Sequence, residues 1–262
     1  MSSNHPSAED AGAPVRRREG GPEGAEAGAP VRRREGGPEG AEVAPPVRRR
    51  QRGPEGAKRA DILDAATDRF GRDGYDDTKW ADIATDVGVG PTALYHYFES
   101  KQHCLFVIMD HAIEGFHARF EGLAGEHPGQ LDVLLAIVRD CFVLDEHDIQ
   151  RNRVLVAEQG LLATRSDSPR EEQARQAVRE RIRELEFAWA TFLARAMEQG
   201  VIPNDDPRLL TRAILGLYNS VWHWYRPNGP LALHRAADFF TARILALVGV
   251  APETAQSMLL AA

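Results

Sequence analysis

Residues 78–101, TKWADIATDVGVGPTALYHYFESK, decide the fold, because they contain two short helical segments joined by a tight turn. The apolar residues of the first segment share one helix face: Trp80, Ile83, Ala84 and Val87. Gly88 ends this segment, and Pro91 begins the second, where its missing N–H costs nothing. A helix, a glycine-containing turn and a second short helix form a helix-turn-helix unit, whose second helix enters the DNA major groove.

A further helix is predicted immediately before this unit, at residues 58–73. Its apolar side chains recur at the spacing of one buried face: Ile62, Ala65, Ala66 and Phe70. Gly74 is the expected C′ residue of that helix, and Thr78 is the expected N-cap of the next one. Residues 58–104 are therefore predicted to form a three-helix DNA-binding domain.

The second segment of the unit has an inner and an outer side. Leu94 and Phe98 are four residues apart and are expected to face the core. The candidate DNA-contacting residues of this segment are Pro91, Thr92, Ala93, Tyr95, His96 and Tyr97, whose hydroxyl, methyl and ring groups suit phosphates and base edges. Packing against the core is the alternative for Tyr95 and, with more weight, for Tyr97.

Three residues outside this segment are candidates for phosphate contact: Thr78, Lys79 and Lys101. Thr78 and Lys79 open the first helix of the unit. Lys101 begins the helix that follows it, where an ammonium group and free backbone N–H groups can both meet a phosphate.

The stretch GYDDTKWADIATDVGVGPTALYHYFESKQHCLFVIM, at residues 74–109, resembles the DNA-binding domain of the TetR family of transcriptional regulators. The matching residues are Gly74, Tyr75, Thr78, Ile83, Ala84, Gly88, Val89, Leu94, Tyr95, Tyr97, Phe98, Lys101 and Leu105. The resemblance implies that the corresponding positions contact DNA and that the last two long helices form a two-fold dimer. One departure is Gly90, which stands where the family usually has Ser or another capping side chain, so one phosphate-facing hydroxyl is absent.

The rest of the chain is also predicted to be helical, so the fold class is all-α, with about nine helices. Amphipathic stripes occupy about residues 101–123, 130–146, 149–164, 169–199, 206–225 and 231–248, with Gly-, Pro- and Asp-rich breaks between them. No segment alternates with a period of two. Residues 105–250 are expected to form a ligand-binding and dimerisation domain, followed by a C-terminal tail at 251–262.

Two of these segments are apolar on more than one face: RLLTRAILGLYNSVWHWY at 208–225 and ALHRAADFFTARILALVGV at 232–250. Such helices must be covered on two sides. We therefore predict that this pair forms a homodimer, which would set two recognition helices about one DNA turn apart on a pseudo-palindromic double-stranded operator.

A ligand site is predicted from YNSVWHWYRPNGPL, at residues 218–231. Tyr218, Trp222 and Arg226 follow at four-residue spacing and are expected on one helix face. An arginine beside two aromatic rings suits a phosphate or carboxylate and a stacked ring. This segment resembles TetR-family regulators of fatty-acid and steroid catabolism that sense acyl-CoA thioesters. In the alternative, the aromatics pack in a core or an interface and Arg226 caps a helix C-terminus.

Further candidate ligand-binding residues are Phe142, His147, Arg153, Phe187 and Trp189, for which plain core packing is also open. Four histidines, His103, His111, His117 and His147, raise the question of a metal site. They show no ligand spacing with carboxylates, so neither a metal nor a cofactor is predicted.

Residues 1–57 differ in composition from the rest. The repeat GAPVRRREGGPEGAE occurs at 12–26 and 28–42, with an altered third copy at 44–58. The near absence of large apolar side chains predicts a disordered tail. Residues 59–101 carry five basic and nine acidic residues, a net charge of 5 − 9 = −4, so the RRR triplets are a candidate source of phosphate attraction. A duplicated linker without that role is the alternative.

The whole chain has 32 Lys and Arg against 39 Asp and Glu, a net charge of −7, which argues against a general polyanion binder. No apolar run is long enough to span a membrane, and no signal peptide is expected. Cys104 and Cys141 stand among apolar residues and are expected to be reduced thiols. These features favour a cytoplasmic protein.

The resulting prediction is a homodimeric transcriptional regulator and not an enzyme. It would be a repressor that a small-molecule effector, such as an acyl-CoA or another hydrophobic compound, releases from its operator. An activator or an effector-independent regulator of the same fold is the alternative, and a small-molecule-binding enzyme is a further one.

Overall fold

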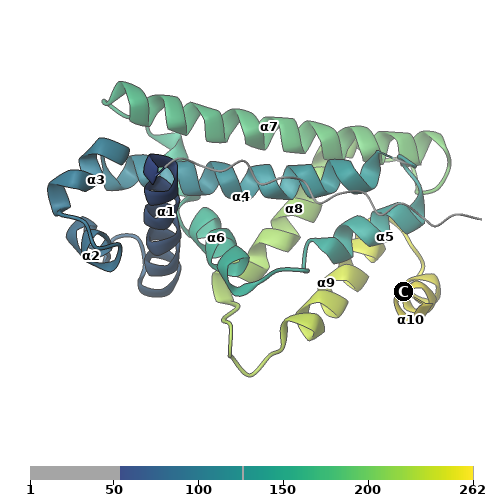
Figure 1. Cartoon of the computed structure of the whole chain (residues 1–262). Helices are drawn as coiled ribbons and strands as arrows, with labels where there is room; N and C mark the ends of the chain where they lie inside the picture. The colour runs from purple at the N-terminus through teal and green to yellow at the C-terminus, as the bar shows by residue number, and fades with distance from the viewer. Residues whose placement is uncertain (1–53, 126, 262) are drawn as a thin grey trace, which may run out of the picture. The chain divides into compact units, whose positions relative to one another are not determined.

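The computed structural model describes residues 54–125 and 127–261, and all regular elements within them are helices. In chain order they are α1 (Pro54–Asp73), α2 (Trp80–Asp86), α3 (Pro91–Tyr97), α4 (Lys101–Ala124), α5 (Leu131–Asp140), α6 (Glu146–Ala157), the 3₁₀ turn η1 (Gln159–Ala163), α7 (Pro169–Glu198), α8 (Pro207–Trp224), α9 (Leu233–Leu247) and α10 (Pro252–Ala261) (Figure 1). The all-α prediction is confirmed. The RRR triplets and the predicted tail up to residue 53 lie outside the described residues.

The structure differs from the prediction at both ends of the described chain. The structure begins α1 at Pro54, inside the third repeat copy, although the tail was predicted to continue to residue 57. The predicted C-terminal tail contains α10, which packs against α9. Ala255 is buried and Met258 packs against the core, a three-residue spacing that marks one short helix face. In the part of the chain that the structure describes, no helix is both long and apolar enough to cross a membrane.

The first three helices, called here the head, pack as their sequence predicts. Most of the predicted inner residues are buried: Ile62, Ala66, Phe70, Ile83, Ala84, Leu94 and Phe98. The other three, Ala65, Trp80 and Val87, are half-buried and pack against this core. Gly74 and Gly88 follow the ends of α1 and α2 with φ angles of +97° and +66°, the left-handed conformation that glycine adopts without strain. Pro91 begins α3, as predicted. The head is thus a small hydrophobic core that holds α3 at its surface.

α4 and α7 connect the head to the remaining helices, called here the body. The two helices lie alongside each other and run in the same direction (Figure 1). Arg181 of α7 binds Asp110 of α4 at 2.6 Å, and further along the Phe120 and Trp189 rings lie 4.9 Å apart. α4 is one unbroken helix that runs from the head into the body.

The head also contacts the body through α1 and α6. A Cβ atom on Gly71 would lie 2.3 Å from Oε1 of Gln150, so the Gln150 side chain rests directly on the α1 backbone. His147 of α6 lies between Asp64 and Asp68 of α1, with one ring nitrogen 3.3 Å from each carboxylate. The head therefore meets the body through α4 and through the α1–α6 interface, and Glu99, between α3 and α4, accepts a hydrogen bond from Ser168 at the start of α7.

Candidate DNA-binding surface and effector cavity

The outer side of α3 is the surface that the sequence assigns to DNA. Tyr95 has 56% of its surface exposed, and Pro91, Thr92 and His96 are exposed as well. Leu94 and Phe98, on the inner side, are almost fully buried and hold the helix in place. An exposed hydroxyl, phenol and imidazole on a short fixed helix can meet base edges and phosphates.

Two other predicted residues of this helix are only partly exposed. Tyr97 packs against the head core, which fits the packing alternative. Ala93 is half-buried. Gly90 is the N-cap of α3 and provides no side-chain hydrogen bond, so this helix start has no side-chain cap.

Thr78 does not cap α2, and this prediction was wrong. The helix starts at Trp80, so Lys79 occupies the N-cap position, without a side-chain hydrogen bond. The Thr78 side chain is buried, and its hydroxyl donates to the Gly74 carbonyl at 2.7 Å. Thr78 therefore closes the α1–α2 turn and has no free hydroxyl for a phosphate. Lys79 is exposed.

Lys101 has an internal role that was not predicted. Its ammonium donates to the carbonyls of Tyr75 and Thr78, at 2.6 and 2.9 Å, and lies 4.1 Å from the centre of the Tyr75 ring. An ammonium group has three donors, so one remains for the predicted phosphate contact. Lys101 thus ties the first turn of α4 to the turn between α1 and α2.

Replacing Lys101 by Met should destabilise the protein by about 2 kcal/mol, because two carbonyls lose a charged donor. This corresponds to a fall in Tm of about 4–8 °C for a domain of this size, which thermal unfolding measures. Lys79→Met is the matched control and should leave Tm unchanged, because Lys79 is exposed and has no side-chain hydrogen bond at the N-cap of α2. Equal Tm values for the two variants would contradict the internal role of Lys101.

A cavity of about 190 Å³, called here the effector cavity, lies between α4, α6, α7 and α8. Its lining residues are Ala112, Ile113, Phe116, Asn152, Leu155, Val156, Gln159, Ile182, Leu185, Glu186, Leu215, Tyr218, Asn219 and Trp222. Tyr218 and Trp222 were predicted to bind ligand; the other residues of this wall were not. Mostly apolar walls with a few amide groups are typical of small-molecule sites.

Tyr218 fixes the polar side of this cavity. Its hydroxyl accepts a hydrogen bond from the Asn152 amide and donates one to the Cys141 carbonyl, both at 3.1 Å. Burial raises the pKa of the Tyr218 hydroxyl well above its usual value, so the group stays protonated. The ring lies 5.4 Å from Trp222 and 5.3 Å from Phe116 of α4. The cavity wall is therefore an aromatic cluster that touches the helix leading to the head.

Four of the other predicted ligand residues lie outside the effector cavity. Phe142 packs behind its wall, against Tyr218 and Trp222. Trp189 is in the main core, 1% exposed, and Phe187 is 73% exposed on α7 because it points away from α4. His147 lies at the α1–α6 interface. The core-packing alternative fits Phe142 and Trp189, whereas Phe187 is exposed and His147 contacts α1.

Arg153 and Arg226 line a different depression, where α1, α6 and α8 end. α8 ends at Trp224, and its C-cap Tyr225 is extended, so the four-residue spacing does not continue to Arg226. Nη1 of Arg226 donates to the carbonyls of His223 and Tyr225, at 3.3 and 3.0 Å. The helix-capping alternative for Arg226 is therefore confirmed.

The comparisons with known proteins agree with this geometry. Residues 62–108 match the family described as "Bacterial regulatory proteins, tetR family", and residues 156–248 match "Tetracyclin repressor-like, C-terminal domain". The chain belongs to the TetR family of transcriptional regulators. The first match covers most of the head and the start of α4, and the second runs from the end of α6 through α9.

Individual relatives support the same assignment. The regulator is 25% identical over 192 residues to the HTH-type transcriptional repressor KstR2 of Mycobacterium tuberculosis, which covers 72% of this chain and 91% of KstR2. It is 28% identical to the TetR-family regulator PfmR from Thermus thermophilus, with a TM-score of 0.56 and coverage of 71% and 97%. The structure of AibR with isovaleryl coenzyme A and operator DNA has the same fold, at 20% identity, a TM-score of 0.60 and coverage of 71% and 97%.

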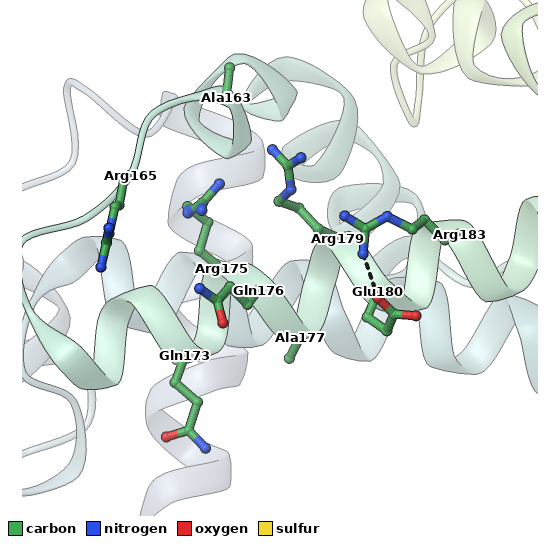
Figure 2. A pocket seen from close by; sticks show the side chains of 9 residues that line it. All are labelled: Ala163, Arg165, Gln173, Arg175, Gln176, Ala177, Arg179, Glu180 and Arg183. Carbon is green, nitrogen blue, oxygen red and sulfur yellow. Dashed lines mark hydrogen bonds and ion pairs between the residues drawn. The ribbon is translucent and has the colours of Figure 1, made fainter.

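A larger depression of about 690 Å³ runs along the first half of α7, and Figure 2 shows its arginines. Three of them are engaged with the protein itself. Arg175 and Arg179 both donate to the Leu162 carbonyl, at 2.6 and 3.0 Å, and Arg183 pairs with Glu180 (Figure 2). This basic surface of the regulator is a solvated helix face whose charges are partly satisfied, unlike the apolar effector cavity.

Proposed function

We propose that the regulator is a homodimeric repressor that a hydrophobic small molecule in the effector cavity releases from a pseudo-palindromic operator, in the cytoplasm where the DNA lies. The proposal rests on the path of α4, which runs from the head to the effector cavity. Its first residue, Lys101, is tied to the head, and its middle residues, Ala112, Ile113 and Phe116, line the cavity. A ligand that displaces this helix would change the separation of the two heads, and hence their fit to DNA.

The dimer surface in this proposal is the outer side of α8 and α9. Leu209, Ala213 and Gly216 share one exposed face of α8. On α9, Phe239 is 54% exposed and Leu247 is 43% exposed. Large apolar side chains gathered on two neighbouring helices are typical of a protein interface. Glycine at position 216 would let a partner helix approach closely.

The proposed effector is an acyl-CoA thioester with a short or branched acyl group. A volume of about 190 Å³ is smaller than the 300–1,000 Å³ typical of sites for whole drug-sized ligands, so it suits the acyl group alone. AibR is a structural neighbour crystallised with isovaleryl coenzyme A, and the relative KstR2 is named a repressor. Among the described residues that line the cavity there is one carboxylate, Glu186, and no histidine, cysteine or lysine. The proposal is therefore binding and not catalysis.

Leu155→Trp should separate effector binding from DNA binding. Leu155 lines the cavity, and an indole there would fill much of its volume. In fluorescence anisotropy with DNA from upstream of its own gene, isovaleryl-CoA should lower the affinity of the wild-type protein by about 5- to 150-fold. The variant should bind this DNA normally and lose the response.

Leu231→Trp, at an exposed site between α8 and α9, is the matched control and should respond like the wild type. A panel of thioesters that leaves DNA affinity unchanged would contradict the effector class. Release of Leu155→Trp by the same thioester as the wild type would contradict the location of the site.

A further inference from the structure

The depression that holds Arg153 and Arg226, called here the cationic groove, is a second candidate site, with a volume of about 270 Å³. It is lined by Phe70, Gly71, Arg72, Asp73, Gly74, Arg153, Ala157, Glu158, Trp222, His223 and Arg226. These residues come from the C-terminal ends of α1, α6 and α8. Trp222 lines both this groove and the effector cavity, so the two sites share one wall.

Arg153 is incompletely satisfied within the protein. Nη1 donates to Oε1 of Gln150 at 3.0 Å, whereas Nε is shielded from solvent and has no hydrogen-bond partner. Burial lowers the pKa of Arg153, and the nearby Arg226 guanidinium lowers it further. A partly desolvated cation beside a like charge is unfavourable unless an anion is present.

The two carboxylates of the groove do not supply that anion. Asp73 binds Arg72, with Nε and Oδ1 3.0 Å apart. Burial and the neighbouring Asp76 raise the pKa of Glu158, and the cation that opposes this effect is Lys101 rather than either groove arginine. The charged residues that influence Glu158 are therefore Asp76 and Lys101, which do not line the groove, and neither groove arginine is among them.

Of Arg153 and Arg226, only Arg226 donates hydrogen bonds to carbonyls at a helix C-terminus of the groove. Arg226 donates to the carbonyls of His223 and Tyr225, as a cation at a helix C-terminus does. The Nε group of Arg153 meets no carbonyl. A ligand oxygen anion between the two guanidinium groups would satisfy charges that the helix ends leave unpaired.

We propose that the cationic groove binds an anionic oxygen group, a phosphate or a carboxylate, between Arg153 and Arg226. The proposal that an anion binds here depends only on the geometry of the groove. The proposal that the anion affects DNA binding rests on the proposed function. Arg153 holds Gln150, and Gln150 rests on the backbone of Gly71 in α1. An anion that draws Arg153 away from Gln150 therefore alters the α1–α6 contact and the position of the head.

Thermal unfolding at constant ionic strength tests the site, with inorganic pyrophosphate and coenzyme A as separate probes. At ten times its dissociation constant, a bound probe should raise Tm by about 3–5 °C. This gain should be lost in Arg153→Gln and in Arg226→Gln. Arg195→Gln, at the exposed far end of α7, is the control and should keep it. Arg226 is also exposed, so its replacement should not prevent folding.

The two probes distinguish the source of the anion. Saturable, Arg226-dependent stabilisation by both indicates a site for free phosphate groups. The same stabilisation by coenzyme A alone indicates that the groove takes the anionic part of a larger effector. Absence of saturable stabilisation by either probe, or equal stabilisation of all variants, would overturn the proposal. If Arg226→Gln folds and binds its operator normally in the absence of a probe, the DNA-binding function is intact even though the anion site is lost.

Discussion

The double replacement Tyr95→Ala and His96→Ala is expected to lower the affinity for operator DNA by at least about 30-fold, which corresponds to about 2 kcal/mol. Both side chains are exposed on α3, and each contact with a base edge contributes about 1–3 kcal/mol. Because neither packs in the core, stability should change by no more than about 0.5 kcal/mol. Fluorescence anisotropy with labelled operator measures the first quantity, and thermal unfolding measures the second.

His127→Ala, in the loop between α4 and α5, is the control and should bind operator like the wild type, because this exposed histidine lies far along the chain from α3. Tyr97→Ala should behave differently from the double variant, since Tyr97 packs against the head core. It should lower Tm as well as affinity. Full operator affinity of the Tyr95 and His96 double variant would contradict the assignment of α3 as the recognition helix.

Gly216→Arg and Phe239→Asp are each expected to convert the proposed dimer into a monomer. In a two-fold interface every substitution occurs twice, so each would bury two unpaired like charges, at a cost of several kcal/mol. A Cβ atom on Gly216 meets nothing within 4 Å, so the monomer tolerates arginine there. Light scattering after size-exclusion chromatography measures the mass, and operator affinity should fall because each head then binds one half-site alone.

Arg195→Asp is a charge change of similar kind at an exposed position near the end of α7, outside the proposed interface, and it should leave the proposed dimer intact. Gly216→Ala is the conservative partner of Gly216→Arg and should keep most of the dimer. A monomeric wild-type protein at micromolar concentration, or a Gly216→Arg variant that stays dimeric, would contradict the proposed interface.

The head could be predicted from the sequence because its determinants are local. Gly74 and Gly88 end helices, Pro91 begins one, and the i, i+4 pair Leu94 and Phe98 identifies the inner face of α3. Each of these signals depends on residues within one turn of the chain. Helix positions in the body could be predicted for the same reason.

The partners of polar groups could not be predicted in the same way. Whether Thr78 caps α2 or closes the preceding turn depends on a single backbone rotation at the helix start. The Lys101 ammonium meets carbonyls 23 and 26 residues earlier in the chain, and no local pattern encodes that contact. Both predictions assigned to DNA a donor that the structure uses inside the head, in the Thr78 hydroxyl fully and in the Lys101 ammonium for two of its three donors.

The effector cavity could be predicted only in part, because four helices form it. Spacing within α8 placed Tyr218 and Trp222 together but continued falsely to Arg226, beyond the end of the helix. Residues of α4, such as Ile113 and Phe116, were missed. Residues 104–109, CLFVIM, are apolar on every side, which is typical of a helix buried all round, but none of them lines the cavity.

Footprinting of the purified regulator on the DNA upstream of its own gene tests the central claim most directly. We expect protection of two inverted half-sites whose centres lie about one helical turn, 10–10.5 base pairs, apart or a multiple of it. The Tyr95 and His96 double variant should lose this protection, and an effector thioester should remove it from the wild type. Uniform protection without a preferred site, or the same footprint for the double variant, would contradict a sequence-specific regulator that reads DNA with α3.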